Sequence, residues 1–194
     1  MSTLSGANKK FFIKKLAASA VMLSLATILS IFPTIQAPFG GSITIGSMVP
    51  VIFITLIFGK KWGIITAMGY SFIQLMLGFS MVASWGLSLG VFIGCLIIDY
   101  ILAYSILGLA GIFGNRKLWQ VVTGTAFVCI MRYLFHVLSG ILFFGMWAEA
   151  GFNAYTWSII YNGGYMLPET IITITITIAL FKLLPYIRKM YNVE

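Results

Sequence analysis

Six long apolar runs, separated by short polar or basic stretches, constrain the fold of this chain more than any other feature of its sequence. They extend from Leu16 to Phe32, Ile43 to Phe58, Trp62 to Phe79, Leu87 to Phe113, Leu118 to Phe144 and Trp157 to Leu184. An α-helix needs about 20 apolar residues to cross the hydrocarbon core of a bilayer. The pattern therefore predicts an all-α membrane protein, a bundle of six transmembrane helices that forms one integral-membrane domain over residues 1–194.

The composition supports a membrane location and excludes several classes of protein. Of the 194 residues, 60% are hydrophobic and 8% are charged, whereas an ordinary soluble domain is about 25% charged. Such a chain has too few charges to cover a surface that faces water, so we do not expect a soluble enzyme. Its sequence has one histidine, two cysteines within apolar runs, and no metalloprotease, P-loop or serine hydrolase motif. We therefore predict no catalytic residue, no metal and no cofactor.

The distribution of basic residues predicts the orientation of the bundle. Of the twelve Lys and Arg, all except Arg132 lie near the two termini or in the second-to-third and fourth-to-fifth turns. With six spans these four positions share one side, and an excess of Lys and Arg marks the cytoplasmic side of a membrane protein. We expect a cytoplasmic segment over residues 1–12 and a cytoplasmic tail over residues 185–194. The basic clusters also fit anionic membrane lipid better than nucleic acid.

Two of the runs resemble other kinds of segment. The first follows a cluster of lysines, as in a secretory signal peptide. It is longer than the usual apolar region of about 7–15 residues, so we expect it to be retained as a span. Residues 170–178 largely alternate threonine and isoleucine, with the period of a strand. Because a lone strand leaves its backbone polar groups unpaired in lipid, we predict a helix there too.

Four ionisable side chains interrupt the last three runs at comparable depths: Asp99, Arg132, His136 and Glu169. Each charge at such a depth costs roughly 2.5–3.5 kcal/mol and normally faces the bundle interior or a water-filled cavity. One interpretation is an ion pair between Asp99 and Arg132 that joins two helices, and the other is a ligand site. With His136 neutral, two carboxylates and one guanidinium leave a net negative charge, which favours a cationic or strongly hydrogen-bonding solute.

Further polar and aromatic residues fall toward the outer ends of the spans or in the outer loops: Gln74, Trp85, Trp147, Trp157, Tyr161 and Asn162. Aromatic rings stack on flat heterocycles and face cations. They also gather at membrane interfaces without any ligand, so both interpretations stay open. On the first helix, Ala20 and Ser24 form a small-x-x-x-small pattern that permits close approach, either by a neighbouring helix of this chain or by another protein.

In combination these residues resemble a known family, the substrate-binding S-components of energy-coupling factor (ECF) transporters, and within it the thiamine-specific ThiT group. The motifs that carry the resemblance are Gly40-Gly41-Ser42 with Pro50, Asp99-Tyr100, Arg132-Tyr133-x-x-His136-x-x-Ser139-Gly140, Phe143-Phe144-Gly145, and Tyr161-Asn162 with Tyr165-Met166-x-Pro168. The resemblance extends from about Lys15 to Leu184.

The resemblance implies a multi-pass subunit of the bacterial plasma membrane that captures thiamine from outside, beneath the first outer loop near residues 34–43. Such a subunit docks on a module of one EcfT membrane protein and two EcfA ATPases. In this chain, the residues implied to contact thiamine are Asp99, His136, Trp157 and Asn162. We add Gln74 and Tyr161 to the predicted binding site. We expect Arg132 and Glu169 to contact the binding residues and not the ligand.

The resemblance also assigns the small residues Ala20 and Ser24 to docking on EcfT. Two other functions are compatible with the residues. An S-component for another small vitamin or heterocycle would share everything except the chemistry of the pocket. A structural or assembly membrane protein would have no small-molecule ligand, and its buried charges would only join helices.

Overall fold

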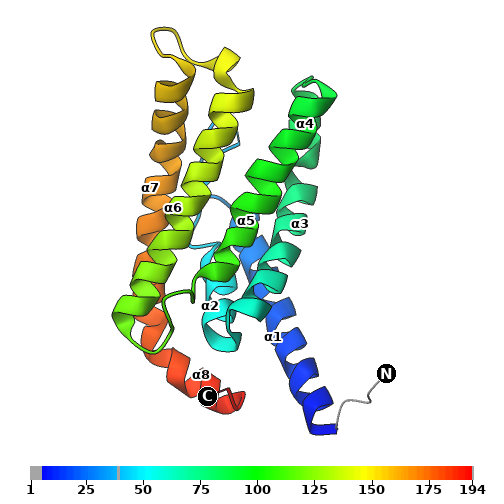
Figure 1. Ribbon diagram of the computed structural model, residues 1–194, viewed down its shortest axis with the longest axis vertical. Coiled ribbons are helices and arrows are strands. Elements are labelled where there is room, and N and C mark those ends of the chain that lie inside the picture. Colours follow the sequence, from blue (N-terminus) through cyan, green and yellow to red (C-terminus); the bar gives the residue numbers. More distant parts are fainter. Residues whose placement is uncertain (1–5, 39, 194) are drawn as a thin grey trace.

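The computed structural model describes residues 6–38 and 40–193, and helices make up most of it (Figure 1). The long helices are α1 (Gly6–Ile31), α3 (Lys60–Ser84), α6 (Leu118–Phe143) and α7 (Ala154–Leu180). A further span is continuous but composite, and consists of α4 (Leu89–Cys95), the π-helix η1 (Leu96–Leu102), α5 (Ala103–Ser105) and the 3₁₀-helix η2 (Ile106–Leu109). Shorter elements are α2 (Val49–Phe58), η3 (Gly145–Trp147), η4 (Phe181–Leu183), α8 (Leu184–Met190) and the strands β1 (Ile35–Gln36) and β2 (Ser42–Ile43).

These elements confirm the predicted all-α bundle of apolar helices, with one correction. Five helical stretches of the described chain are long and apolar enough to cross a membrane, whereas α2 has 10 residues. The run from Ile43 to Phe58 was expected to be helical throughout, but α2 begins at Val49. Gly46 has a φ of +79°, which belongs to a turn, and Pro50 lies in the first helical turn. At about 1.5 Å per residue, α2 spans only half of a bilayer core.

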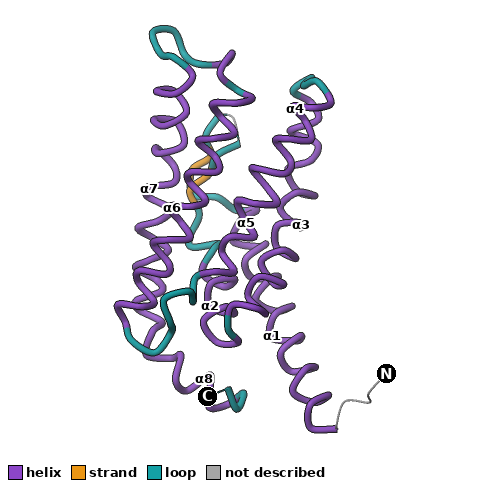
Figure 2. Tube along the Cα trace, in the orientation of Figure 1, coloured by secondary structure: helices purple, strands orange, loops and turns teal. Residues whose placement is uncertain are grey.

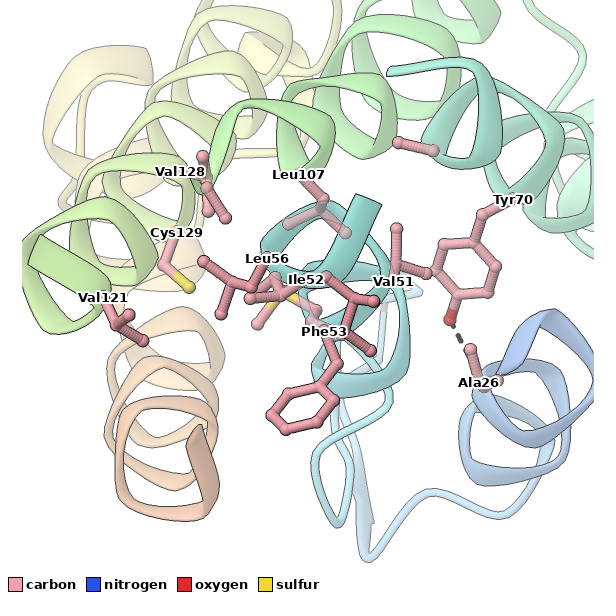
Figure 3. Packing of buried hydrophobic residues seen from close by; sticks show 14 of the residues in the cluster. Ala26, Val51, Ile52, Phe53, Leu56, Tyr70, Leu107, Val121, Val128 and Cys129 are labelled. Carbon is pink, nitrogen blue, oxygen red and sulfur yellow. Dashed lines mark hydrogen bonds between the residues drawn. The ribbon is translucent and has the colours of Figure 1, made fainter. Parts of the chain in front are cut away.

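The short helix α2 forms the centre of the hydrophobic core. Every residue from Val49 to Ile57 is buried, as expected for a helix that is apolar on all sides. Figure 3 shows Ile52 and Leu56 of α2 surrounded by side chains of other helices, among them Leu107 and Val128. The helix packs against α1, α3 and η2, so it holds together one half of the bundle.

The other half contains a short hairpin in the segment expected to form the first outer loop, and α2 does not begin until Val49. Strands β1 and β2 pair antiparallel, with Ile35 opposite Ile43, and lie beyond the N-terminal end of α2 (Figure 2). The chain after β2 is attached to α7 by Glu169, whose carboxylate accepts hydrogen bonds from the Thr44 backbone N–H and hydroxyl, both at 2.6 Å. Glu169 is 2% exposed. It therefore satisfies irregular backbone that lipid would leave unpaired.

Both ends of the described chain lie at the same end of the bundle, together with the α2–α3 turn and the connection before α6 (Figure 1). We call this the basic end, because it carries every Lys and Arg except Arg132. Here Arg188 of α8 donates to the backbone carbonyl oxygens of Leu56 (2.8 Å) and Asn115 (2.7 Å). A cation thus compensates the C-terminal carbonyls of α2. The assignment of this end to the cytoplasm stays a prediction.

The threonine-rich stretch at residues 170–178 is helical, as predicted, and lies within α7. Thr173 and Thr177 face the interior, whereas Ile171 and Ile178 are exposed. The strand-like alternation of the sequence therefore does not decide the conformation, because a helix satisfies its own backbone groups.

The contacts of Glu169 generate a test of the hairpin. We expect Glu169→Leu to lower the free energy of unfolding by about 1–3 kcal/mol, because the buried Thr44 N–H loses its acceptor. Protease cleavage within residues 35–48 should also accelerate. Glu169→Gln is the matched control, since its amide keeps an acceptor oxygen and should cost less. Thermal unfolding and limited proteolysis of the purified protein measure both effects, and a leucine variant that matches the wild type contradicts the anchoring role.

Candidate ligand-binding site

A cavity of about 120 Å³ lies between α3, the α4–η1 helix, α6, α7 and the hairpin, in the half of the bundle away from the basic end. This volume holds several water molecules. Eight of its twenty lining residues are aromatic: Trp85, Tyr100, Tyr104, Phe144, Trp147, Trp157, Tyr161 and Tyr165. Backbone of Gly40, Gly41 and Ser42 closes one side. The cavity thus has apolar aromatic walls with a small number of polar groups, which is typical of a site for a small organic molecule.

The π-helix η1 presents the acidic group of this cavity. Asp99 lies in the middle of η1, and Cys95, Tyr100 and Tyr104 line the cavity from the same composite helix. A π-helix replaces the usual i→i+4 hydrogen bonds by i→i+5 bonds and is frequently found at functional sites. The apolar run from Leu87 to Phe113 gives no indication of this local change, so the sequence prediction missed it.

Asp99 accepts three hydrogen bonds from two helices. Its partners are His136 Nδ1 at 2.8 Å, the hydroxyl of Ser139, and Cys95 Sγ at 3.4 Å. The hydrogen-bonded partner of Asp99 is therefore His136, and Asp99 makes no ion pair with Arg132. An ionised Asp99 requires a hydrogen on Nδ1, which leaves Nε2 of a neutral His136 as an acceptor. Nε2 has no partner among the described residues.

Asn162 is held in one orientation by its neighbours. The Tyr165 hydroxyl donates to Asn162 Oδ1 at 2.6 Å, and Asn162 Nδ2 donates to the Ser158 carbonyl at 2.9 Å. Gly140 of α6 lies directly opposite, where a Cβ atom would collide with Ser158 Oγ. The glycine therefore permits α6 and α7 to approach closely beside the amide, and the position of this polar group is fixed before any ligand enters.

Stacked and edge-on rings continue the aromatic wall. Trp157 and Tyr161 of α7 stack with a centroid separation of 5.9 Å and an angle of 29°. On the other side Trp85, at the end of α3, packs edge-on against Trp147 at 5.8 Å and Phe144 at 5.4 Å. Rings from distant parts of the sequence thus surround the cavity at its end away from Arg132.

Five of the six residues predicted to bind the ligand line the cavity: Asp99, His136, Trp157, Tyr161 and Asn162. The sixth, Gln74, does not. It lies on the face of α3 that meets α1, and its Nε2 donates to Ser30 Oγ at 2.8 Å. Helical spacing placed Gln74 at a suitable depth, but the direction of the side chain follows its hydrogen-bond partner.

Arg132 and Glu169 were expected to lie behind the binding residues, but Arg132 lies closer to the cavity than expected and Glu169 lies farther from it. Arg132 lines the cavity, with its guanidinium 4.2 Å from the centroid of the Tyr104 ring. Glu169 does not line it and instead binds Thr44 of the hairpin. With His136 neutral, the charged lining residues are Asp99 and Arg132, whose formal charges cancel. The expected net negative charge is therefore absent from the wall, and a cation would depend on aromatic faces as well as on Asp99.

Ala20 and Ser24 are exposed on α1. The Ser24 hydroxyl bonds to the Ala20 carbonyl of its own helix at 3.0 Å. A shallow groove of small and aliphatic residues passes over both positions, formed by Ala20, Leu23, Ser24, Thr27, Ile28 and Ile73. Within the described residues, no group of three His, Cys, Asp or Glu side chains is arranged to hold a metal ion.

Comparison with known proteins connects this arrangement with transport. The family described as "Thiamine transporter protein (Thia_YuaJ)" matches residues 16–189. A protein of Bacillus subtilis strain 168, named thiamine transporter ThiT, is 30% identical over 184 residues, which cover 88% of this chain and 91% of the relative. A protein of the same name from Lacticaseibacillus paracasei is 30% identical over 103 residues, covering 46% of this chain and 50% of the relative.

A solved structure of ThiT from Listeria monocytogenes has the same fold, with a TM-score of 0.71 and 23% identity, covering 91% of this chain and 97% of the other. The family is one of transport proteins and not of enzymes. Together with the long apolar helices, this makes the protein a multi-pass protein of the bacterial cell membrane. The match over residues 16–189 shows that the chain belongs to the thiamine transporter protein (Thia_YuaJ) family.

Proposed function

We propose that this chain is a single-domain S-component that captures thiamine from outside the cell for uptake driven by ATP hydrolysis in a partner. The observation that carries the proposal is the cavity, in which the Asp99–His136 pair lies among eight aromatic rings. Family membership and the relatives named thiamine transporters support thiamine over other solutes.

Thiamine combines a positively charged thiazolium ring with an aminopyrimidine ring, and the cavity offers a partner for each. Aromatic faces attract a cation, by about 2 kcal/mol or more when the cation is desolvated, and the stacked Trp157 and Tyr161 rings provide such faces. The carboxylate of Asp99 balances the charge. The free Nε2 of His136 accepts from an amino group, and Asn162 adds a fixed amide at the same level.

The proposed energy source is a module of one EcfT membrane protein and two EcfA ATPases. The exposed groove along α1, with Ala20 and Ser24 on its floor, is the proposed docking surface for EcfT. Small side chains suit this role because they allow two helix backbones to approach closely within a membrane. In this proposal the basic end faces the cytoplasm, so that the hairpin covers the cavity on the external side.

Asp99→Asn tests the role of the carboxylate. We expect thiamine binding to weaken by about 1–3 kcal/mol, because the change removes the carboxylate that balances the positive charge of the ligand. Calorimetric titration of the purified variant measures the loss. Glu149→Gln, the same chemical change in a residue outside the cavity lining, is the matched control and should bind like the wild type. Equal affinities of Asp99→Asn and the control would exclude Asp99 from the binding site.

A panel of vitamins separates thiamine from the second candidate, an S-component for another heterocycle. The proposal requires thiamine to bind more tightly than riboflavin, biotin or purine bases in competition experiments. Tighter binding of any of these would reassign the substrate without changing the fold or the proposed partner.

Ala20→Trp tests docking. The substitution fills the groove on α1, so we expect unchanged thiamine affinity together with uptake that falls at least tenfold in cells that express the complete transporter. Leu25→Trp introduces the same side chain at an exposed position of α1 outside the groove and serves as the control. If Ala20→Trp supports the same uptake as Leu25→Trp, the groove is not the docking surface.

A further inference from the structure

Of the two charged side chains that line the cavity among the described residues, Asp99 and Arg132, the proposed thiamine site gives a role only to Asp99. Building on that proposed function, we propose that Arg132 binds the ligand directly: its guanidinium donates a hydrogen bond to a ring nitrogen of the aminopyrimidine. Arg132 would then donate to an uncharged acceptor of the ligand. This role differs from that of Asp99, which balances the charge of the ligand.

Arg132 lies at the end of the cavity that is nearer the basic end of the bundle. It lies on α6 one helical turn before His136, nearer the basic end, and both side chains line the cavity. The ring of Tyr104 lies 4.2 Å from the guanidinium carbon. This cation–π contact uses the face of the ring and leaves the N–H donors of the guanidinium available to an acceptor.

The protein supplies no acceptor for these donors. Arg132 is 8% exposed, its Nε has no hydrogen-bond partner, and residues 6–38 and 40–193 give the guanidinium neither a hydrogen bond nor an ion pair. A guanidinium carries five N–H donors, and leaving a buried charge unpaired is costly. The contents of the cavity must therefore supply the acceptor.

The carboxylates of Asp99 and Glu169 do not fill this role, because each is engaged elsewhere. Asp99 is occupied by His136, Ser139 and Cys95, and Glu169 holds Thr44. Neither makes an ion pair with Arg132. With these acceptors engaged, the ligand or water is left to satisfy Arg132.

The neighbouring His136 indicates which kind of acceptor is read. Because Asp99 binds Nδ1, His136 offers Nε2 as an acceptor, whereas Arg132 offers only donors. One face of α6 thus presents an acceptor and a donor at successive turns. A 4-aminopyrimidine presents the complementary groups, an amino donor beside a ring nitrogen acceptor. This match favours the pyrimidine edge over the hydroxyl of thiamine as the partner of Arg132.

The test is a set of titrations with thiamine and three analogues. In two analogues one pyrimidine nitrogen is replaced by C–H, and in the third the hydroxyl is removed. The readout is the ratio of thiamine affinity to analogue affinity, because removing the positive charge of Arg132 changes the affinity for every cationic analogue alike. We expect at least one carbon-for-nitrogen analogue to bind the wild type tenfold or more weakly, and to bind Arg132→Met within twofold of thiamine.

Arg132→Lys keeps the charge but not the planar fork, and should give an intermediate ratio. It also keeps the test valid if Arg132→Met does not fold. Arg188→Met, which removes the guanidinium at the basic end, should retain the wild-type ratio. Equal ratios in the wild type and in the folded Arg132 variants would overturn the inference, as would a ratio that changes only for the analogue without the hydroxyl. Failure of the wild type to bind thiamine would instead reject the proposed function.

Discussion

A carboxylate inside an apolar helix bundle requires hydrogen-bond donors. Two carboxylates, the partly buried Asp99 and the buried Glu169, organise the half of the bundle that contains the cavity. Asp99 accepts hydrogen bonds from His136 and Ser139 and thereby connects the π-helix η1 to α6. Glu169 of α7 binds Thr44 and attaches the hairpin. One carboxylate thereby shapes the polar wall of the cavity, and the other holds the backbone that closes it.

The short helix α2 explains why a cavity exists at this level of the bundle. Its ten residues fill the interior near the basic end, and Arg188 secures its last turn. The segment before α2 consists of irregular backbone and two short strands. It occupies less volume than a helix that crosses the whole membrane. The aromatic side chains of the surrounding helices line the remaining space. The protein thus combines a packed half, which provides stability, with an open half, which is available to a ligand.

The sequence predicted which segments are helical and how deep each polar residue lies in the membrane. It did not predict the direction in which each side chain points. Apolar runs identified the helices, and helical spacing brought Asp99, His136 and Asn162 to a common level. The same reasoning put Gln74 in the cavity, because depth does not reveal which neighbour a helix face meets. The π-helix and the attachment of Glu169 to Thr44 have no signal in a single sequence, since both depend on contacts between distant segments.

The central claim is that the cavity binds thiamine, and tryptophan fluorescence measures this most directly, because three of the five tryptophans, Trp85, Trp147 and Trp157, line the cavity. Titration of the purified wild-type protein with thiamine should change the emission in a saturable manner, with one molecule bound per chain. A fluorescence signal that does not respond to thiamine, accompanied by no heat of binding in a calorimetric titration, would contradict the account.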